Sequence, residues 1–284
     1  MIVVTGASGQ LGRLVIEALL QTVPASQVVA AVRNPAKAGD LAARGVQVRQ
    51  ADYSQPATLD AAFKGADKLL LISSSEVGQR AAQHRAVIEA AQRAGVKLVA
   101  YTSILHADAS PLGLAAEHQE TEALLRASGL PFVLLRNGWY TENYAGGIPA
   151  ALAHGVVLGS AGAGRIASAA RADYAAAAAA VLTQADQAGR IYELAGDGSY
   201  TLAEFAAEIA RQSGKAVVYQ DLPEADYKAA LLSVGLPEGL AGLLADSDVG
   251  ASRGGLFDDS HQLSQLIGRP TTPLAASVSA ALAA

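Results

Sequence analysis

The chain has 284 residues, of which 51% are hydrophobic, and its formal net charge at pH 7 is −5. This hydrophobic content excludes an intrinsically disordered chain, and the acidic balance argues against nucleic acid as a main partner. No cysteine is present, which excludes disulfides, thiolate nucleophiles and zinc–thiolate sites.

The first half of the chain alternates between predicted strands and predicted helices. The strands are nearly continuous runs of Val, Ile, Leu and Ala, which are typical of strands buried on both faces of a parallel sheet. This alternation predicts an α/β fold with a Rossmann-type doubly wound parallel sheet. We expect strands at residues 3–5, 28–32, 46–49, 68–72, 98–102 and 132–135, and helices at 10–20, 36–43, 57–63, 78–94 and 114–127.

The second half is punctuated by glycine and proline, and its elements are harder to delimit. We expect a dinucleotide-binding domain over residues 1–137 and a smaller C-terminal α/β lobe over residues 138–284. Segments at about 156–200 are expected to return to the main sheet. Further elements are expected at 191–194, 202–213 and 217–219, followed by a helical tail.

Nothing in the sequence predicts insertion into a membrane. The alanine run at residues 175–180 is flanked by Arg171 and Asp173, so we interpret it as a helix packed closely on the sheet. The N-terminus starts directly with a strand. It lacks the basic region, apolar segment and cleavage site that make up a secretory signal peptide. We therefore expect a cytoplasmic protein.

A glycine-rich turn joins the first strand to the first helix. Its glycines are Gly6, Gly9 and Gly12, within the stretch TGASGQLG. Glycines at such a turn allow a tight bend and a close approach to phosphate, and the helix N-terminus then offers backbone N–H groups to a pyrophosphate. Because the turn lies between a strand and a helix, it predicts nucleotide binding rather than a purely structural turn.

Arg33 stands at the end of the second strand, 21 residues after Gly12. An Asp or Glu there binds the 2′-hydroxyl of NAD, whereas an arginine accommodates the 2′-phosphate of NADP. The strand end carries no acid, so the sequence favours NADPH over NADH. A solvated surface arginine is the alternative, and Lys37 either assists or is solvated.

The glycine spacing resembles that of the extended and atypical short-chain dehydrogenases, which carry a Ser or Thr after the fifth strand and Tyr-x-x-x-Lys on the next helix. Here Leu114 stands in place of the tyrosine and His118 in place of the lysine. A reaction that needs an activated alcohol as proton donor is therefore not expected. The same loss is found in the NmrA-like branch of that family.

Several longer motifs make the resemblance more specific. The stretches VRNPAKA, RQADYSQP, RNGWYTENY and IASAARADYAAA resemble the type 2 NAD(P)H:quinone oxidoreductases, and the likeness covers essentially the whole chain. Triphenylmethane dye reductases are more distant relatives. The resemblance implies a Rossmann domain with a small C-terminal lobe, the use of NADPH without flavin, and the reduction of quinones.

The resemblance also implies which residues bind the cofactor. A polar turn is the alternative for the serine run at residues 73–75, which follows the fourth strand, and an ion pair with Asp173 is the alternative for Arg171. The expected cofactor-binding residues are Gly6, Ala7, Ser8, Gly9, Gln10, Leu11, Arg33, Ser73, Ser74, Ser75, Asn137, Gly138, Trp139, Tyr140, Thr141, Glu142 and Arg171.

Hydride addition to a quinone needs alignment of the reactants and polarisation of a carbonyl, and solvent can protonate the product. Asn143 and Tyr140 are the expected catalytic hydrogen-bond donors. Trp139 and Tyr144 suit a flat wall for an aromatic acceptor, or plain core. The five histidines have no metal-ligand spacing, so we expect no metal. Whether His106 or His118 takes part in proton transfer is left open.

Two other functions are compatible with the sequence. An NmrA-like redox sensor would bind NADP and regulate a partner without turnover, and a reductase could act on other flat acceptors such as triphenylmethane dyes. We expect a small-molecule quinone as substrate and no nucleic acid partner. A homodimer is compatible with the sequence, which shows no interface, and the physiological acceptor is not defined.

Overall fold

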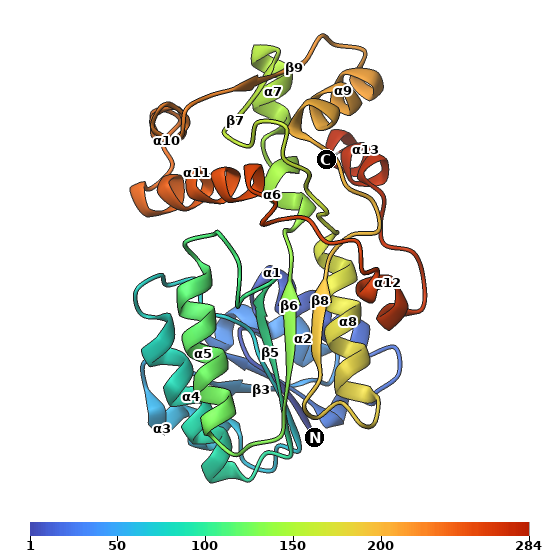
Figure 1. Cartoon of the computed structure of the whole chain (residues 1–284). Coiled ribbons are helices and arrows are strands. Elements are labelled where there is room, and N and C mark those ends of the chain that lie inside the picture. Colours follow the sequence, from blue (N-terminus) through green and yellow to red (C-terminus); the bar gives the residue numbers. More distant parts are fainter. Residues whose placement is uncertain (284) are drawn as a thin grey trace. The chain divides into compact units, whose positions relative to one another are not determined.

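The computed structural model describes residues 1–283. Its main feature is a seven-stranded sheet in the order β3-β2-β1-β4-β5-β6-β8, whose registered pairs run parallel (Figure 1). The predicted Rossmann-type fold is therefore confirmed. The strands are β1 (Ile2–Val4), β2 (Val28–Val32), β3 (Gln47–Gln50), β4 (Lys68–Leu71), β5 (Leu98–Ile104), β6 (Phe132–Asn137) and β8 (Ile191–Leu194).

The inner strands are mainly apolar because both faces of the sheet are covered. Every residue of β1, β2 and β5 is buried. Alternate strand residues, such as Val3, Leu69 and Val99, join a core with residues of α3, α4 and α5. The helices associated with the sheet are α1 (Gln10–Leu19), α2 (Gly39–Ala43), α3 (Pro56–Ala62), α4 (Arg80–Ala94), α5 (Ala115–Ala127) and α8 (Arg171–Thr183), with short 3-10 turns η1 (Ala25–Gln27) and η2 (Pro35–Ala38).

The alanine-rich run lies in α8, which contacts α1, β4 and β5. Small side chains let this helix approach its neighbours closely, and Ala175, Ala177 and Ala178 are buried. No helix within residues 1–283 is both long enough and apolar enough to cross a bilayer.

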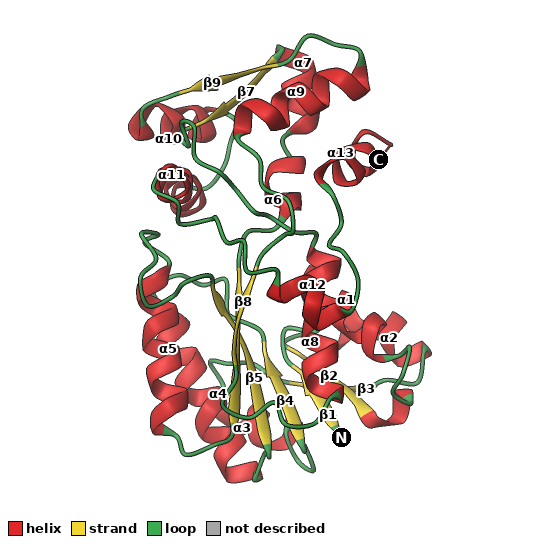
Figure 2. Cartoon of the chain, turned by 45° about the vertical axis from the view of Figure 1, so that its right-hand side comes forward, coloured by secondary structure: helices red, strands yellow, loops and turns green. Residues whose placement is uncertain are grey.

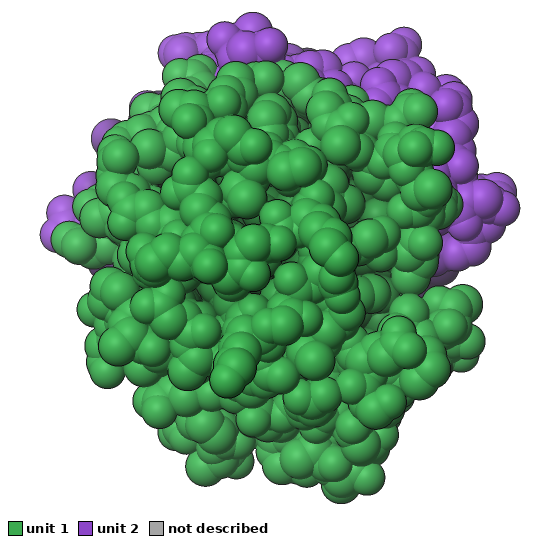
Figure 3. Space-filling model, turned by 90° about the horizontal axis from the view of Figure 1, so that it is seen from below, with its two compact units in different colours: residues 1–104, 116–137, 171–192 green, residues 105–115, 138–170, 193–284 purple. Residues whose placement is uncertain are grey.

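The chain divides into two compact units that alternate along the sequence, and Figure 3 colours them separately. The first unit comprises residues 1–104, 116–137 and 171–192. The second comprises residues 105–115, 138–170 and the chain from residue 193 onward. Figure 2 shows that the chain after β8 is mainly helical, and all of these helices belong to the second unit. Its elements are α6 (Thr141–Ala145), α7 (Ile148–His154), β7 (Val156–Gly159), α9 (Leu202–Ser213), β9 (Val218–Asp221), α10 (Glu224–Ser233), α11 (Glu238–Ser252), α12 (Gln262–Ile267) and α13 (Leu274–Ala283).

Some element boundaries differ from the sequence-based expectation. The helix expected at 36–43 is divided into η2 and α2; the Asn34 side chain accepts a bond from the Ala36 N–H and caps the first of these turns. β5 and β6 are longer than expected because their pairing continues to Ile104 and Asn137. Asn137 therefore ends β6 rather than following it.

A buried carboxylate fixes part of the second unit. Asp248, on α11, is 3% exposed and accepts hydrogen bonds from the Ser160 N–H at 2.9 Å and the Tyr144 hydroxyl at 3.0 Å. Burial raises the pKa of Asp248 to about 6. These bonds hold α6, α11 and the end of β7 together.

Asp248 should make the stability of the chain depend on pH. Because its folded pKa lies above its unfolded pKa, the folded chain keeps a proton that the unfolded chain has already lost. The free energy of unfolding should therefore decrease as pH rises from about 4 to about 6, by up to about 3 kcal/mol. Chemical denaturation of the wild type and of Asp248→Asn across this range measures the effect. Parallel pH profiles for the two proteins would contradict it.

Candidate functional site

The glycine turn after β1 brings the start of α1 against the backbone that precedes it. Gly6 has a φ of +58°, a conformation that side chains rarely allow. A Cβ on Gly12 would lie 2.5 Å from the Gly6 carbonyl oxygen, and one on Gly9 would lie 3.2 Å from the same atom. These contacts leave no room for side chains, so backbone and helix end meet directly. The first N–H groups of α1 lack intrahelical partners and are available to an anion.

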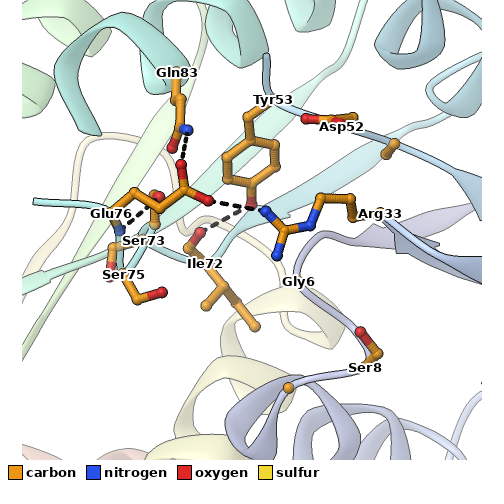
Figure 4. Close-up of a pocket in the computed structure, with 13 residues that line it drawn as sticks. Gly6, Ser8, Arg33, Asp52, Tyr53, Ile72, Ser73, Ser75, Glu76 and Gln83 are labelled. Atoms are coloured by element: carbon orange, nitrogen blue, oxygen red, sulfur yellow. Dashed lines mark hydrogen bonds and ion pairs between the residues drawn. The ribbon is translucent and has the colours of Figure 1, made fainter. Parts of the chain in front are cut away.

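A cavity of about 310 Å³ opens beside this turn (Figure 4). It lies where the carboxyl ends of β1, β2, β3 and β4 meet, and the strand order reverses at this place, between β1 and β4. Open α/β sheets bind ligands at such a switch point. The cavity is lined by Gly6, Ser8, Gly9, Arg33, Ala51, Asp52, Tyr53, Ile72, Ser73, Ser74, Ser75, Glu76 and Gln83.

Arg33 enters this cavity from the end of β2 and forms an ion pair there. Its Nη1 lies 2.9 Å from Oε1 of Glu76, and 72% of the Arg33 side chain is exposed. The other oxygen of Glu76 accepts a bond of 2.8 Å from Nε2 of Gln83. Gln83 is 7% exposed, and its Oε1 has no hydrogen-bond partner in the structure. The cavity therefore contains a cation, an anion and an unused buried acceptor.

The serine loop, residues 73–75 after β4, is held to the sheet by backbone N–H groups that bond to buried side chains. The Ser73 N–H donates to Thr102 Oγ1 at 2.8 Å, and the Ser74 N–H donates to His84 Nε2 at 2.9 Å. Because Nε2 accepts this bond, the proton of His84 is on Nδ1, which lies 2.9 Å from Thr121 Oγ1. Burial lowers the pKa of His84 to about 3, so the imidazole is neutral near pH 7.

His118 has a similar environment on α5. It is 6% exposed, and its Nδ1 lies 2.7 Å from the hydroxyl of Tyr101. Burial, and then the charge of Arg80, lower the pKa of His118 to about 3. The imidazole of His118 is therefore neutral near pH 7. His106 belongs to the second unit, where its Nε2 lies 3.3 Å from Oδ2 of Asp258.

The structure brings part of the expected cofactor set together. Of the expected residues, the cavity wall contains Gly6, Ser8, Gly9, Arg33, Ser73, Ser74 and Ser75. Ala7 is buried in the turn, and Gln10 and Leu11 begin α1. Asn137, at the end of β6, is buried, and its Oδ1 has no hydrogen-bond partner. Arg171 is the first residue of α8.

The remaining expected residues lie in the second unit, around α6. Trp139 is buried, and Tyr140 stands immediately before the helix. The Thr141 N–H donates to the Ala169 carbonyl at 3.0 Å, which fixes the start of α6. Glu142 and Asn143 are exposed on its first turn. None of these residues lines the cavity described above.

Sequence reasoning missed six residues that line the cavity: Ala51, Asp52, Tyr53, Ile72, Glu76 and Gln83. Asp52 and Tyr53 follow β3, so their place at the carboxyl edge of the sheet was a usable signal. The Tyr53 hydroxyl donates to the Ile72 carbonyl at 2.9 Å. Within residues 1–283 no group of three or more His, Asp or Glu side chains is arranged to hold a metal ion.

Comparison with known proteins gives a consistent result. A family model for NAD(P)H-binding proteins matches residues 6–185. Quinone oxidoreductase 2 of Escherichia coli (strain K12) is 67% identical over 279 residues, which is 98% of each chain.

Solved structures give the same picture. The crystal structure of an NADPH-dependent quinone oxidoreductase from Escherichia coli, complexed with NADPH, matches with a TM-score of 0.97 and 67% identity, covering 99% of this chain and 100% of the other. The Citrobacter sp. triphenylmethane reductase complexed with NADP(H) matches with a TM-score of 0.95 and 40% identity, at 99% and 100% coverage. The chain thus belongs to the NAD(P)H-binding family and, within it, to the type 2 NAD(P)H:quinone oxidoreductases that its motifs resemble.

Proposed function

We propose that this chain catalyses the NADPH-dependent reduction of quinones by direct hydride transfer. The observation that carries this function is the 67% identity, over 98% of both chains, with an oxidoreductase named for quinones. A structural relative of the same identity was solved with NADPH bound. We place the activity in the cytoplasm, with a small-molecule quinone as acceptor.

The first unit offers the groups that such a cofactor requires. The glycine cradle and the N-terminus of α1 suit a pyrophosphate, since a Cβ on Gly12 would fill the space beside Gly6. Arg33 suits the 2′-phosphate, because guanidinium and phosphate form charge-assisted hydrogen bonds. The rigid serine loop suits the nicotinamide-side ribose and phosphates. The remaining proposed cofactor residues are Asn137, Gly138, Trp139, Tyr140, Thr141, Glu142 and Arg171.

The protein itself has to align the two reactants and polarise the quinone carbonyl. NADPH supplies a hydride when bound, and the quinone is already electrophilic. The missing Tyr-x-x-x-Lys pair then matters little, because solvent can protonate the hydroquinone anion. We assign Asn143 and Tyr140 the role of hydrogen-bond donors that polarise the quinone carbonyl. His118 is neutral and buried, so we assign it no proton transfer.

A second candidate function has support of its own. The triphenylmethane reductase of Citrobacter sp. is 40% identical over nearly the whole chain, so flat dyes are reasonable alternative acceptors. The NmrA structure that matches is 18% identical and therefore supports a common fold alone. Turnover distinguishes the enzyme from a redox sensor.

The direct test mixes the purified chain with NADPH and a simple benzoquinone and follows absorbance of the reduced nicotinamide. We expect turnover without a flavin absorbance band, and full activity after treatment with a chelator. A triphenylmethane dye serves as the competing acceptor. Binding of NADPH without turnover of any acceptor would favour the sensor, and a flavin needed for turnover would contradict the mechanism.

Replacing Arg33 with Ala should weaken binding of NADPH more than binding of NADH. The lost charge-assisted hydrogen bonds are worth about 1.5–3 kcal/mol, and exposure of Arg33 reduces this value, so we expect a loss of about tenfold for NADPH. Calorimetric titration with both dinucleotides measures the effect. Arg44→Ala is the matched control, because Arg44 forms an exposed pair with Glu17 away from the cavity. An equal loss for both dinucleotides would contradict the assignment.

Asn143→Ala should lower kcat with quinone and leave the affinity for NADPH nearly unchanged. Loss of one donor to a developing oxyanion lowers the rate by ~10²–10³, and by less where the charge is delocalised over a ring. The control is His118→Asn, which retains a partner for the Tyr101 hydroxyl and should change kcat only a few-fold. Steady-state kinetics across pH, with NADPH affinity measured separately, decides between them. If His118→Asn abolishes turnover in a folded protein while Asn143→Ala retains it, a histidine acid carries the chemistry.

A further inference from the structure

The end of β2 carries no acid, yet the structure places a carboxylate against Arg33. Glu76 comes from the loop after β4 and lies 43 residues away in sequence. β2 and β4 flank β1, so their ends are about 10 Å apart. Gly6 continues β1 between them and has no side chain. Figure 4 shows the Arg33 and Glu76 side chains meeting across this gap.

Two hydrogen bonds fix the position of Glu76. The buried Gln83 donates from Nε2 to Oε2 of Glu76, and the Glu76 N–H donates to Ser74 Oγ at 3.1 Å. Oε1 of Glu76 is thereby turned toward Arg33. The carboxylate presents an anionic oxygen to the guanidinium, in the way that a phosphate oxygen would.

We propose that Glu76 reduces the preference for NADPH over NADH by occupying Arg33 in place of a 2′-phosphate. This inference rests on the proposed function and concerns the same cavity. A 2′-phosphate competes with Glu76 for the guanidinium and also meets a like charge. A dinucleotide with a free 2′-hydroxyl meets the kind of acid that NAD-binding folds use to accept its hydrogen bond, supplied here from another strand.

The magnitudes allow this exchange. Both members of the pair are exposed, with 72% of Arg33 and 46% of Glu76 accessible, and water screens such a pair so that it is weak. A 2′-phosphate carries about −1.5 to −2 charge near pH 7, more than the single charge of Glu76, so NADPH can displace Glu76 from Arg33. The competition reduces the advantage of NADPH without removing it. Glu76 therefore moderates the selectivity that Arg33 provides.

The test is Glu76→Gln, which removes the charge and keeps the shape and a carbonyl acceptor. Calorimetric titration of the folded protein should show NADPH binding tighter by about two- to fivefold, with NADH unchanged or slightly weaker. Adenosine 2′,5′-bisphosphate should gain affinity in the same way, and adenosine 5′-monophosphate should not. These fragments have no nicotinamide, so the result is independent of turnover.

Glu17→Gln is the matched control. Glu17 forms an exposed pair with Arg44 at 3.8 Å in the same unit, and its removal changes the net charge equally. We expect no change in selectivity there. If Glu17→Gln gained as much affinity for NADPH as Glu76→Gln, the change in net charge alone would explain the effect. That result would overturn the proposal.

Arg33→Ala and the double variant test whether Glu76 acts through Arg33. If Glu76 occupies Arg33, the gain from Glu76→Gln should be at least halved in the Arg33→Ala background. A gain of full size there would overturn the competition. Failure of the wild type to bind either dinucleotide would contradict the proposed function itself, whereas normal NADPH binding with unchanged selectivity in Glu76→Gln would contradict this inference alone.

Discussion

Helix α1 begins so close to the turn before it that a Cβ on Gly12 would lie 2.7 Å from the Cα of Ala7. This contact between backbones determines the direction in which the helix N-terminus points. It also leaves no side chain at Gly6 and Gly9, which line the cavity. The space in which Arg33 and Glu76 meet depends on that absence. The glycine turn thus provides both an anion-binding helix end and room for the groups that select the ligand.

The region that other short-chain dehydrogenases use for proton transfer has a structural role in this chain. Thr102 Oγ1 accepts a bond from the serine loop, and the Ser103 hydroxyl donates to the buried Glu122 at 2.7 Å. His118 binds the hydroxyl of Tyr101 in the interior. These groups are committed to hydrogen bonds that hold the loop and helix α5 against the sheet. A reaction compatible with this arrangement needs no protein acid, which agrees with a quinone as acceptor.

Neutral buried histidines explain how this polar interior is tolerated. A charged imidazole there would lack compensation, and burial lowers the pKa of both His84 and His118 to about 3. In its neutral form His84 accepts from the Ser74 N–H and can donate to Thr121. These two bonds satisfy both ring nitrogens of His84 and hold the serine loop, whose Ser74 carbonyl also accepts a bond of 2.8 Å from Nε of the buried Arg80.

The sequence by itself determined the fold class, because continuous apolar runs form strands only where both faces of a sheet are covered. It also determined the glycine turn and the position of Arg33 at the end of β2, since both depend on residues close together in the chain. The tertiary structure alone decided that Glu76 faces Arg33, that Gln83 is buried behind it, and that His118 is neutral. The first depends on the strand order β2-β1-β4, which brings together two residues that are 43 positions apart, and the other two depend on burial. No local spacing encodes such a meeting, because it is the packing of the sheet that creates it.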